Sequence, residues 1–156
     1  DNINYGVIIM ETLGAELDTF LMKKRTQAEL LSVCNGISKI LNHCREKRIT
    51  HGDLALFNIA FNSEGNIVFL DFDRAANFYN PLVDYLRLNV ELFVSTQSNG
   101  TKKIHPNNLK FLRTCLPSWA EALDIQTTKY TAKNADLLWT KAYSKYCKAA
   151  KVKCLD

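Results

Sequence analysis

The sequence predicts an α+β fold that is mainly α-helical, with a short β-hairpin and one apolar strand near the start of the chain. Three observations support this prediction. Apolar residues recur at helical spacing over long stretches, two short apolar runs flank a turn-rich segment at 62–66, and an uncharged run rich in β-branched residues occupies 5–10. The 156 residues, 47% of them hydrophobic, suffice for one globular domain with a buried core.

The composition of the chain excludes only a few classes of function. The net charge of +4 could favour anionic ligands, but it does not indicate a specific nucleic-acid partner. No apolar run is long enough to span a membrane, and the first residues do not read as a signal peptide. The five cysteines are scattered and form no C-x-x-C pair, which predicts free thiols in a reducing, cytoplasmic compartment rather than a zinc site.

The sequence up to about residue 47 predicts one strand followed by two helices. Residues 5–10 combine Val and Ile with no charge and predict a buried strand, and a helical pattern follows from Ala15 to about Met22. Thr26 is a good N-cap for a long amphipathic helix over about 27–47. Gly36 weakens that helix by about 1 kcal/mol relative to Ala, which favours a close packing contact at this position.

A hairpin pattern follows, with polar residues at its two ends. Residues 59–61 and 67–70 are apolar runs on either side of the turn-rich segment. A hairpin carries its ends to one edge, so Asn58 and Asp71 should face each other there. Two oxygen ligands suit Mg²⁺, which takes few protein ligands and leaves positions open for phosphates. Asp53, on the preceding loop, could accept a proton from a substrate hydroxyl.

The rest of the chain reads as helical. Pro81 opens a helix that runs to about Val94, and residues 97–108 read as a mobile, polar surface loop. Helical stretches are predicted at 109–115, 118–123 and 135–151. The last stretch has an apolar face, which predicts packing against the core. Its opposite face is expected to meet solvent, or alternatively a docking partner, and carries Lys141, Lys145 and Lys148.

The stretch 51–73 resembles the catalytic and metal-binding loops of the protein-kinase-like superfamily, H-x-D-x-x-x-x-N followed by D-F-G. Gly52, Ala55 and Asp73 depart from the protein-kinase pattern, and the His-Gly-Asp sequence is more similar to aminoglycoside and choline phosphotransferases and related atypical kinases. The residues that match in type and spacing are His51, Asp53, Asn58, Asp71 and Phe72.

The resemblance implies roles for these residues. Asp53 would orient and deprotonate the acceptor hydroxyl, while Asn58 and Asp71 would hold Mg²⁺ on the phosphates of ATP. His51 would be a scaffold of the catalytic loop rather than a base. Asp84 would brace the backbone of that loop, with an exposed aspartate at a helix N-terminus as the equal alternative.

By the same resemblance, residues 1–14 would be the last strand and the hinge of a small lobe, and residues 15–156 the C-terminal large lobe. The nucleotide would be bound by four residues: Met10 as gatekeeper, the carbonyl of Glu11, the amide of Leu13, and Ala60.

The resemblance implies an ATP- and Mg²⁺-dependent phosphotransferase acting on a hydroxyl of a small molecule or an unusual protein site. No Gly-rich loop, strand lysine or A-P-E segment is present in the sequence. The alternative is therefore a lobe-only, pseudokinase-like homologue that binds and regulates a partner, such as a kinase, without catalysis. The apolar strand edge at 5–10 predicts self-association, docking of such a partner, or folding over the nucleotide cleft.

Overall fold

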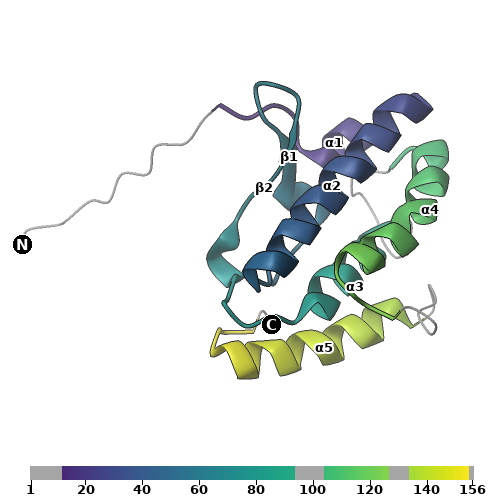
Figure 1. Cartoon of the computed structure of the whole chain (residues 1–156). Helices are drawn as coiled ribbons and strands as arrows, with labels where there is room; N and C mark the ends of the chain where they lie inside the picture. Colours follow the sequence, from purple (N-terminus) through teal and green to yellow (C-terminus); the bar gives the residue numbers. More distant parts are fainter. Residues whose placement is uncertain (1–11, 94–103, 127–133, 155–156) are drawn as a thin grey trace, which may run out of the picture.

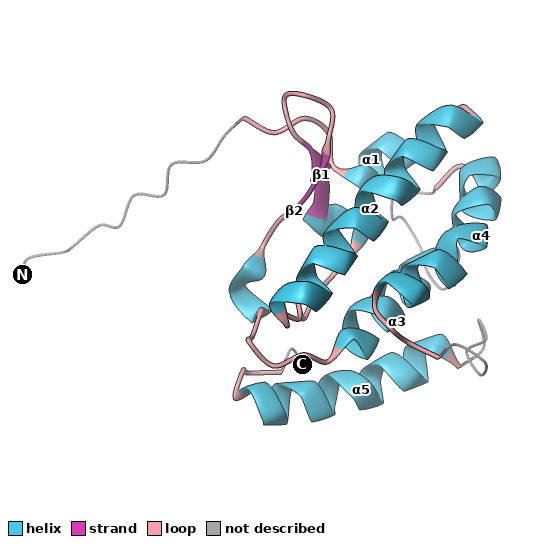
Figure 2. Ribbon diagram, viewed as in Figure 1, coloured by secondary structure: helices cyan, strands magenta, loops and turns pink. Residues whose placement is uncertain are grey.

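The structure is a computed structural model that describes residues 12–93, 104–126 and 134–154. Its helices are α1 (Leu17–Leu21), α2 (Gln27–Lys47), α3 (Pro81–Phe93), α4 (Pro106–Ala122) and α5 (Ala135–Ala150), and its strands are β1 (Ile59–Phe61) and β2 (Ile67–Phe69) (Figures 1 and 2). Two 3-10 turns, η1 (Leu56–Asn58) and η2 (Phe72–Arg74), flank the strand pair. The predicted mainly α fold with one short hairpin is confirmed. The strand predicted at 5–10 lies outside the described residues.

Helix α2 begins and ends where the sequence predicts. The Thr26 side chain accepts a hydrogen bond from the Glu29 backbone N–H, and the Glu29 carboxylate accepts one from the Thr26 N–H at 2.7 Å, which completes a capping box. The helix stops at Arg48, whose backbone is left-handed with φ of 55°. Its apolar face is buried through Leu30, Val33, Cys34, Ile37, Leu41 and Cys44.

The hairpin packs directly on the middle of α2. β1 and β2 pair antiparallel, with Ile59 opposite Phe69 and Phe61 opposite Ile67. A Cβ atom added to Gly36 would lie 2.7 Å from Cγ1 of Ile67 and 2.9 Å from its Cβ. The predicted close contact at Gly36 is therefore confirmed, and it fixes how near the hairpin lies to the helix.

Replacing Gly36 by Ala is expected to destabilise the protein, although Ala is the better helix former by about 1 kcal/mol. The added methyl overlaps the stem of Ile67, and overpacking of this kind typically costs about 1–3 kcal/mol. Urea denaturation followed by circular dichroism measures the change. The control is the same substitution in an Ile67→Gly background, where both contacting atoms of Ile67 are removed and Gly36→Ala should stabilise the protein. A single Gly36→Ala variant more stable than the wild type would contradict the contact.

Helix α4 differs from the prediction of two helical stretches with a loop before them. It is one continuous helix that includes Pro117, and it begins at Pro106, inside the segment 97–108 for which the sequence predicts a surface loop. An interior proline removes one backbone hydrogen bond and typically costs about 3 kcal/mol. Burial on both sides of Pro117 outweighs this cost, because the face toward α2 includes Leu112, Leu116, Trp119 and Ala120.

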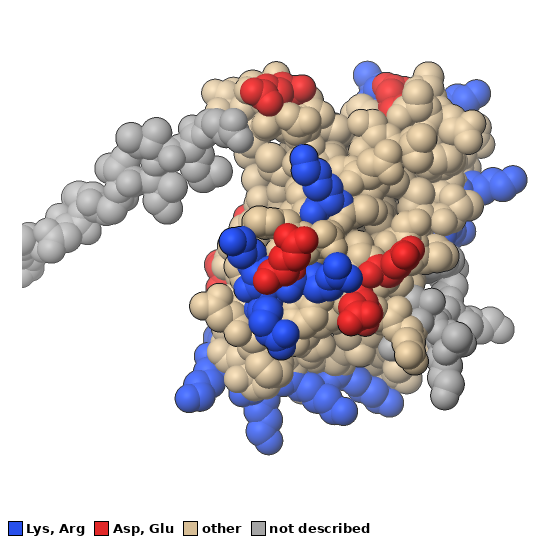
Figure 3. Space-filling model, viewed as in Figure 1, with Lys and Arg blue, Asp and Glu red and all other residues tan. Residues whose placement is uncertain are grey.

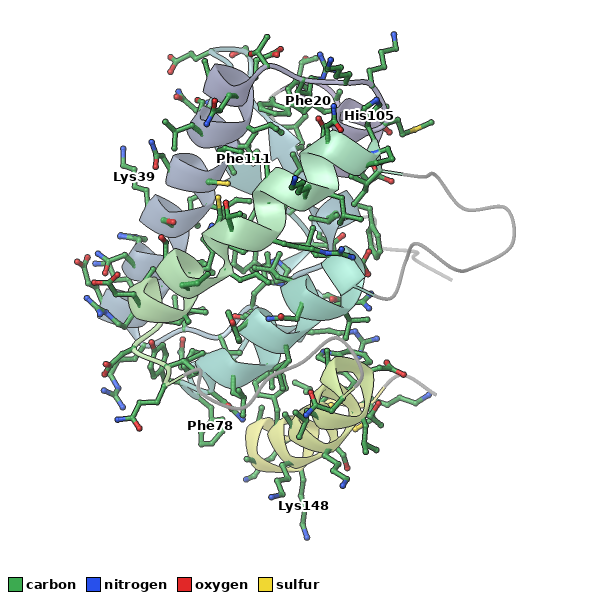
Figure 4. All side chains as sticks on the ribbon, turned by 90° about the vertical axis from the view of Figure 1, so that its right-hand side faces the viewer. Phe20, Lys39, Phe78, His105, Phe111 and Lys148 are labelled. Carbon is green, nitrogen blue, oxygen red and sulfur yellow. The ribbon has the colours of Figure 1, made fainter. Side chains whose placement is uncertain are left out.

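Asn108 also contradicts the loop prediction, because it is fully buried rather than exposed. Its side-chain oxygen accepts from the Arg25 N–H, and its amide nitrogen donates to the carbonyls of Leu21 and Lys23. His105 lies beside it, and its N–H donates to the Leu21 carbonyl at 2.9 Å, so the start of α4 is tied to the end of α1 (Figure 4). The polar side chain of Asn108 therefore pairs with backbone groups instead of facing water.

Helix α5 packs against α3, and its two faces are as predicted. Tyr143 and Tyr146 are buried. Lysines line the outer face, where they gather along the lower edge in Figure 3, and Lys148 points away from the body of the protein in Figure 4. All five cysteines are free, as predicted. Within the described ranges, no helix combines the length and apolarity needed to cross a membrane.

Candidate active site

The hairpin brings the two predicted metal ligands to one edge of the fold. Beyond the last strand pair, the Leu70 N–H donates to the Asn58 carbonyl at 2.8 Å, and Asp71 follows immediately. Asp71 is exposed and has a left-handed backbone, with φ of 59° and ψ of 68°. Such a conformation is uncommon outside glycine and concentrates at functional sites. It turns the chain from β2 into η2.

Asn58 connects this edge to the loop that carries Asp53. The residue is 5% exposed, and its Nδ2 donates to the backbone carbonyl of Asp53 at 2.9 Å. Because the amide nitrogen is used in this bond, the amide oxygen is the atom through which Asn58 can coordinate a cation. The backbone of the candidate base and a candidate metal ligand are thus joined by one hydrogen bond.

His51 is fully buried between the loop that carries Asp53 and the segment around Asp71. Its Nε2 lies 2.8 Å from the Leu70 carbonyl, which can only accept, so this nitrogen carries the proton. Its Nδ1 accepts from the Asp53 N–H at 3.4 Å. The ring also contacts the aromatic rings of Phe69 and Phe72, at centroid distances of 5.9 and 4.5 Å. These contacts are those of a scaffold between the two loops.

Asp84, in the first turn of α3, is 2% exposed, so the alternative of an exposed aspartate does not hold. Its two carboxylate oxygens each accept one backbone N–H, from His51 and from Gly52, both at 2.9 Å. Burial raises the pKa of Asp84, while His51 and the two N–H donors oppose that rise. The carboxylate thereby fixes the backbone that leads into Asp53.

Gly52 is required by its surroundings, which the sequence does not reveal. Its φ is +90°, and a Cβ there would collide with the Arg74 carbonyl oxygen and lie 2.9 Å from the Tyr146 hydroxyl. That hydroxyl donates to the same carbonyl. The glycine therefore lets the loop that carries Asp53 approach both η2 and α5.

Two arginines at the site are not part of the H-x-D-x-x-x-x-N and D-F-G pattern, so the motif did not indicate them. Arg87 on α3 donates from Nε to Oδ1 of Asp53 at 3.0 Å. Arg74 donates to the Tyr143 hydroxyl at 3.0 Å and to the Lys153 carbonyl at 2.7 Å, which ties η2 to the C-terminal segment. Helical spacing could have indicated Arg87, because it follows Asp84 by three positions and so lies on the same helix face.

The residues assigned to nucleotide binding are only partly described. Leu13 is half-buried, and next to it the Gly14 N–H donates to the Phe61 carbonyl at 2.7 Å, so this segment runs antiparallel alongside β1. Ala60 is 1% exposed in β1, between β2 and that segment. Met10 and Glu11 lie outside the described residues.

The donor set at the site fits a hard cation. Asn58 and Asp71 offer an amide and a carboxylate oxygen, which suits Mg²⁺ because this ion binds through one or two protein ligands plus phosphates and water. No cluster of three or more His, Cys, Asp or Glu that could hold a metal occurs within residues 12–93, 104–126 and 134–154. With one amide oxygen and one carboxylate, Asn58 and Asp71 suit a cation that a nucleotide helps to bind.

Part of the chain matches a known protein family. Residues 2–112 match the family described as RIO1, RIO domain. The matched segment contains the loop 51–58, the hairpin, η2 and α3, and ends within α4. Helix α5, which contacts Gly52 and Arg74 through its tyrosines, lies beyond the matched residues.

Proposed function

Because the chain belongs to the RIO domain family, an atypical branch of the protein-kinase-like proteins, we propose that it transfers the γ-phosphoryl group of ATP to an acceptor hydroxyl. Family membership implies ATP binding and, in general, use of Mg²⁺. The observation that carries the proposal is the convergence of Asp53, Asn58 and Asp71 on one edge through the hairpin and the Asn58–Asp53 hydrogen bond. The finer resemblance to aminoglycoside and choline phosphotransferases stays a prediction.

In the proposed reaction the acceptor oxygen forms a bond to the γ-phosphorus, the bond from that phosphorus to the β–γ bridging oxygen breaks, and ADP leaves. Asp53 takes the hydroxyl proton on a carboxylate oxygen. Bound Mg²⁺ would neutralise the phosphate oxygens, and Asn58 and Asp71 are the residues that would hold it. Asp84 keeps the backbone next to Asp53 in place by accepting hydrogen bonds from the N–H groups of His51 and Gly52. This matters because positioning of the reacting groups supplies most of the catalysis in phosphoryl transfer.

The acceptor class follows from the sequence. The segment between Asp71 and α3 is short and lacks A-P-E, and position 55 is Ala instead of Lys. Both features support a small-molecule hydroxyl or an unusual protein site over a generic peptide. Retention of the three polar residues supports an enzyme over the lobe-only regulator. The assignment of residues 1–14 to a small lobe remains part of the proposal.

Asp71→Ala and Asn58→Ala are each expected to weaken binding of Mg²⁺-ATP by about 10-fold or more, because each removes one of few protein oxygens on the metal. Isothermal titration calorimetry measures the affinities. Asn35→Ala on α2 and Asp136→Ala on α5, both exposed, are the matched controls and should bind like the wild type. Equal affinities for all five proteins, or a wild type that binds Mg²⁺-ATP no better than Mg²⁺ alone, would contradict the site.

A further inference from the structure

The side chain of Asp53 is paired with a cation from another element. Arg87 Nε and Asp53 Oδ1 are 3.0 Å apart, and the two side chains are only 14% and 17% exposed, for Asp53 and Arg87 respectively. A charge-assisted hydrogen bond with this shielding holds its geometry far better than a surface ion pair. Residues 52–58 contain no Lys or Arg, so the cation beside Asp53 comes from α3 and not from the loop itself.

Arg87 is itself held from two further directions. Its Nη1 lies 3.2 Å from Oε1 of Glu91, one turn along α3. Its guanidinium carbon lies 5.0 Å from the ring centre of Trp139 on α5, within the range of a cation–π contact. Two carboxylates already compensate the charge of Arg87, which argues against a role in binding an anionic substrate.

The contact of α5 with Arg87 depends on how the Trp139 ring is packed. The Trp139 ring stacks on Tyr143 with centroids 5.0 Å apart and planes 14° apart. The Trp139 indole Nε1 is buried without a hydrogen-bond partner among the described atoms. Among the described residues, the ring is held by its packing between Tyr143 and Arg87.

We propose that Arg87 is a positioning residue for Asp53 and that Trp139 of α5 holds Arg87 in place. The bond from Arg87 occupies Oδ1 of the carboxylate and directs Oδ2 toward the acceptor hydroxyl, whose proton it takes. The planar guanidinium meets two carboxylates and one indole face at once, which a lysine ammonium cannot do. This inference rests on the proposed role of Asp53. It makes α5, which lies beyond the RIO match, a part of the site.

The contact itself is tested without any activity. In nuclear magnetic resonance spectra of the whole chain, the Nε–H of Arg87 should exchange with solvent about 10-fold or more slowly than that of the exposed Arg48, since it is bonded and shielded. Trp139→Leu should speed this exchange several-fold. The control Leu137→Ala, at a 57% exposed position on the same helix, should not. Equal exchange of Arg87 and Arg48, or no effect of Trp139→Leu, would overturn the proposal.

A double-mutant cycle tests the positioning role, with ADP release from Mg²⁺-ATP as the assay. Arg87→Met should lower kcat by about 10- to 100-fold, the effect of a misplaced catalytic group, with the KM for ATP within about 2-fold. Arg87→Lys should lie between Arg87→Met and wild type. In an Asp53→Asn background, Arg87→Met should cause no further loss, because its effect passes through Asp53. Thermal unfolding shows that each variant is folded.

The possible outcomes separate the two proposals. Losses that add in the double variant, or a change in KM instead of kcat, would overturn the positioning role while leaving the function intact. An Asp53→Asn variant as active as the wild type would overturn the role of Asp53 as base and, with it, the positioning role of Arg87. In that case the exchange experiment still decides whether the ion pair and its support from Trp139 exist.

Discussion

Asp53→Asn is expected to lower the kcat for phosphoryl transfer by about 10²–10⁴-fold, the usual contribution of a positioned general base. The amide is nearly isosteric, and its oxygen can still accept the bond from Arg87 Nε. The substitution therefore removes basicity and leaves the shape of the site largely unchanged. ADP released from Mg²⁺-ATP, with water or the protein's own hydroxyl groups as acceptor, measures the rate.

The control for this experiment is Asp136→Asn, which changes an exposed aspartate in the first turn of α5. It should retain the wild-type rate. Calorimetric binding of Mg²⁺-ATP by Asp53→Asn should be nearly unchanged, because the metal is assigned to Asn58 and Asp71. An Asp53→Asn rate within about 3-fold of the wild type would exclude Asp53 as the base, since so small a loss is below the range of general-base catalysis.

Asp84→Ala is expected to have the largest effect on stability. It leaves the N–H groups of His51 and Gly52 buried without an acceptor, and each such loss costs about 1–3 kcal/mol, or roughly 2–6 kcal/mol for the pair. The loop that carries Asp53 also loses its anchor, so the activity of any folded fraction should fall as well. Urea denaturation measures the free energy of unfolding.

Asp136→Ala is the matched control, because Asp136 is also an aspartate in the first turn of a helix but is exposed. Its loss should stay below about 1 kcal/mol, the usual size of an interaction with the helix dipole. A similar small loss for Asp84→Ala would mean that Asp84 acts only on the helix dipole and does not brace the loop.

Features with a local physical cause were predictable from the sequence. The bounds of α2 follow from the Thr26 cap and the apolar periodicity, and the hairpin follows from two apolar runs around a turn. The hairpin in turn determined that Asn58 and Asp71 would share one edge. The spacing of His51, Asp53 and the residues around them indicated the kinase-like family to which the RIO match assigns the chain. Their catalytic and metal-binding roles stay predictions.

Features that depend on packing between distant segments were decided only by the tertiary structure. Arg87 reaches Asp53 across 34 positions, and Asp84 reaches Gly52 across 32, because α3 packs beneath the loop. The continuity of α4 through Pro117 depends on the face that it buries against α2, and the need for glycine at 52 depends on the Arg74 carbonyl and on Tyr146. A cap, a turn or a periodicity acts within a few residues and is visible in the sequence. An ion pair or a close backbone approach depends on where another element packs, which no local pattern specifies.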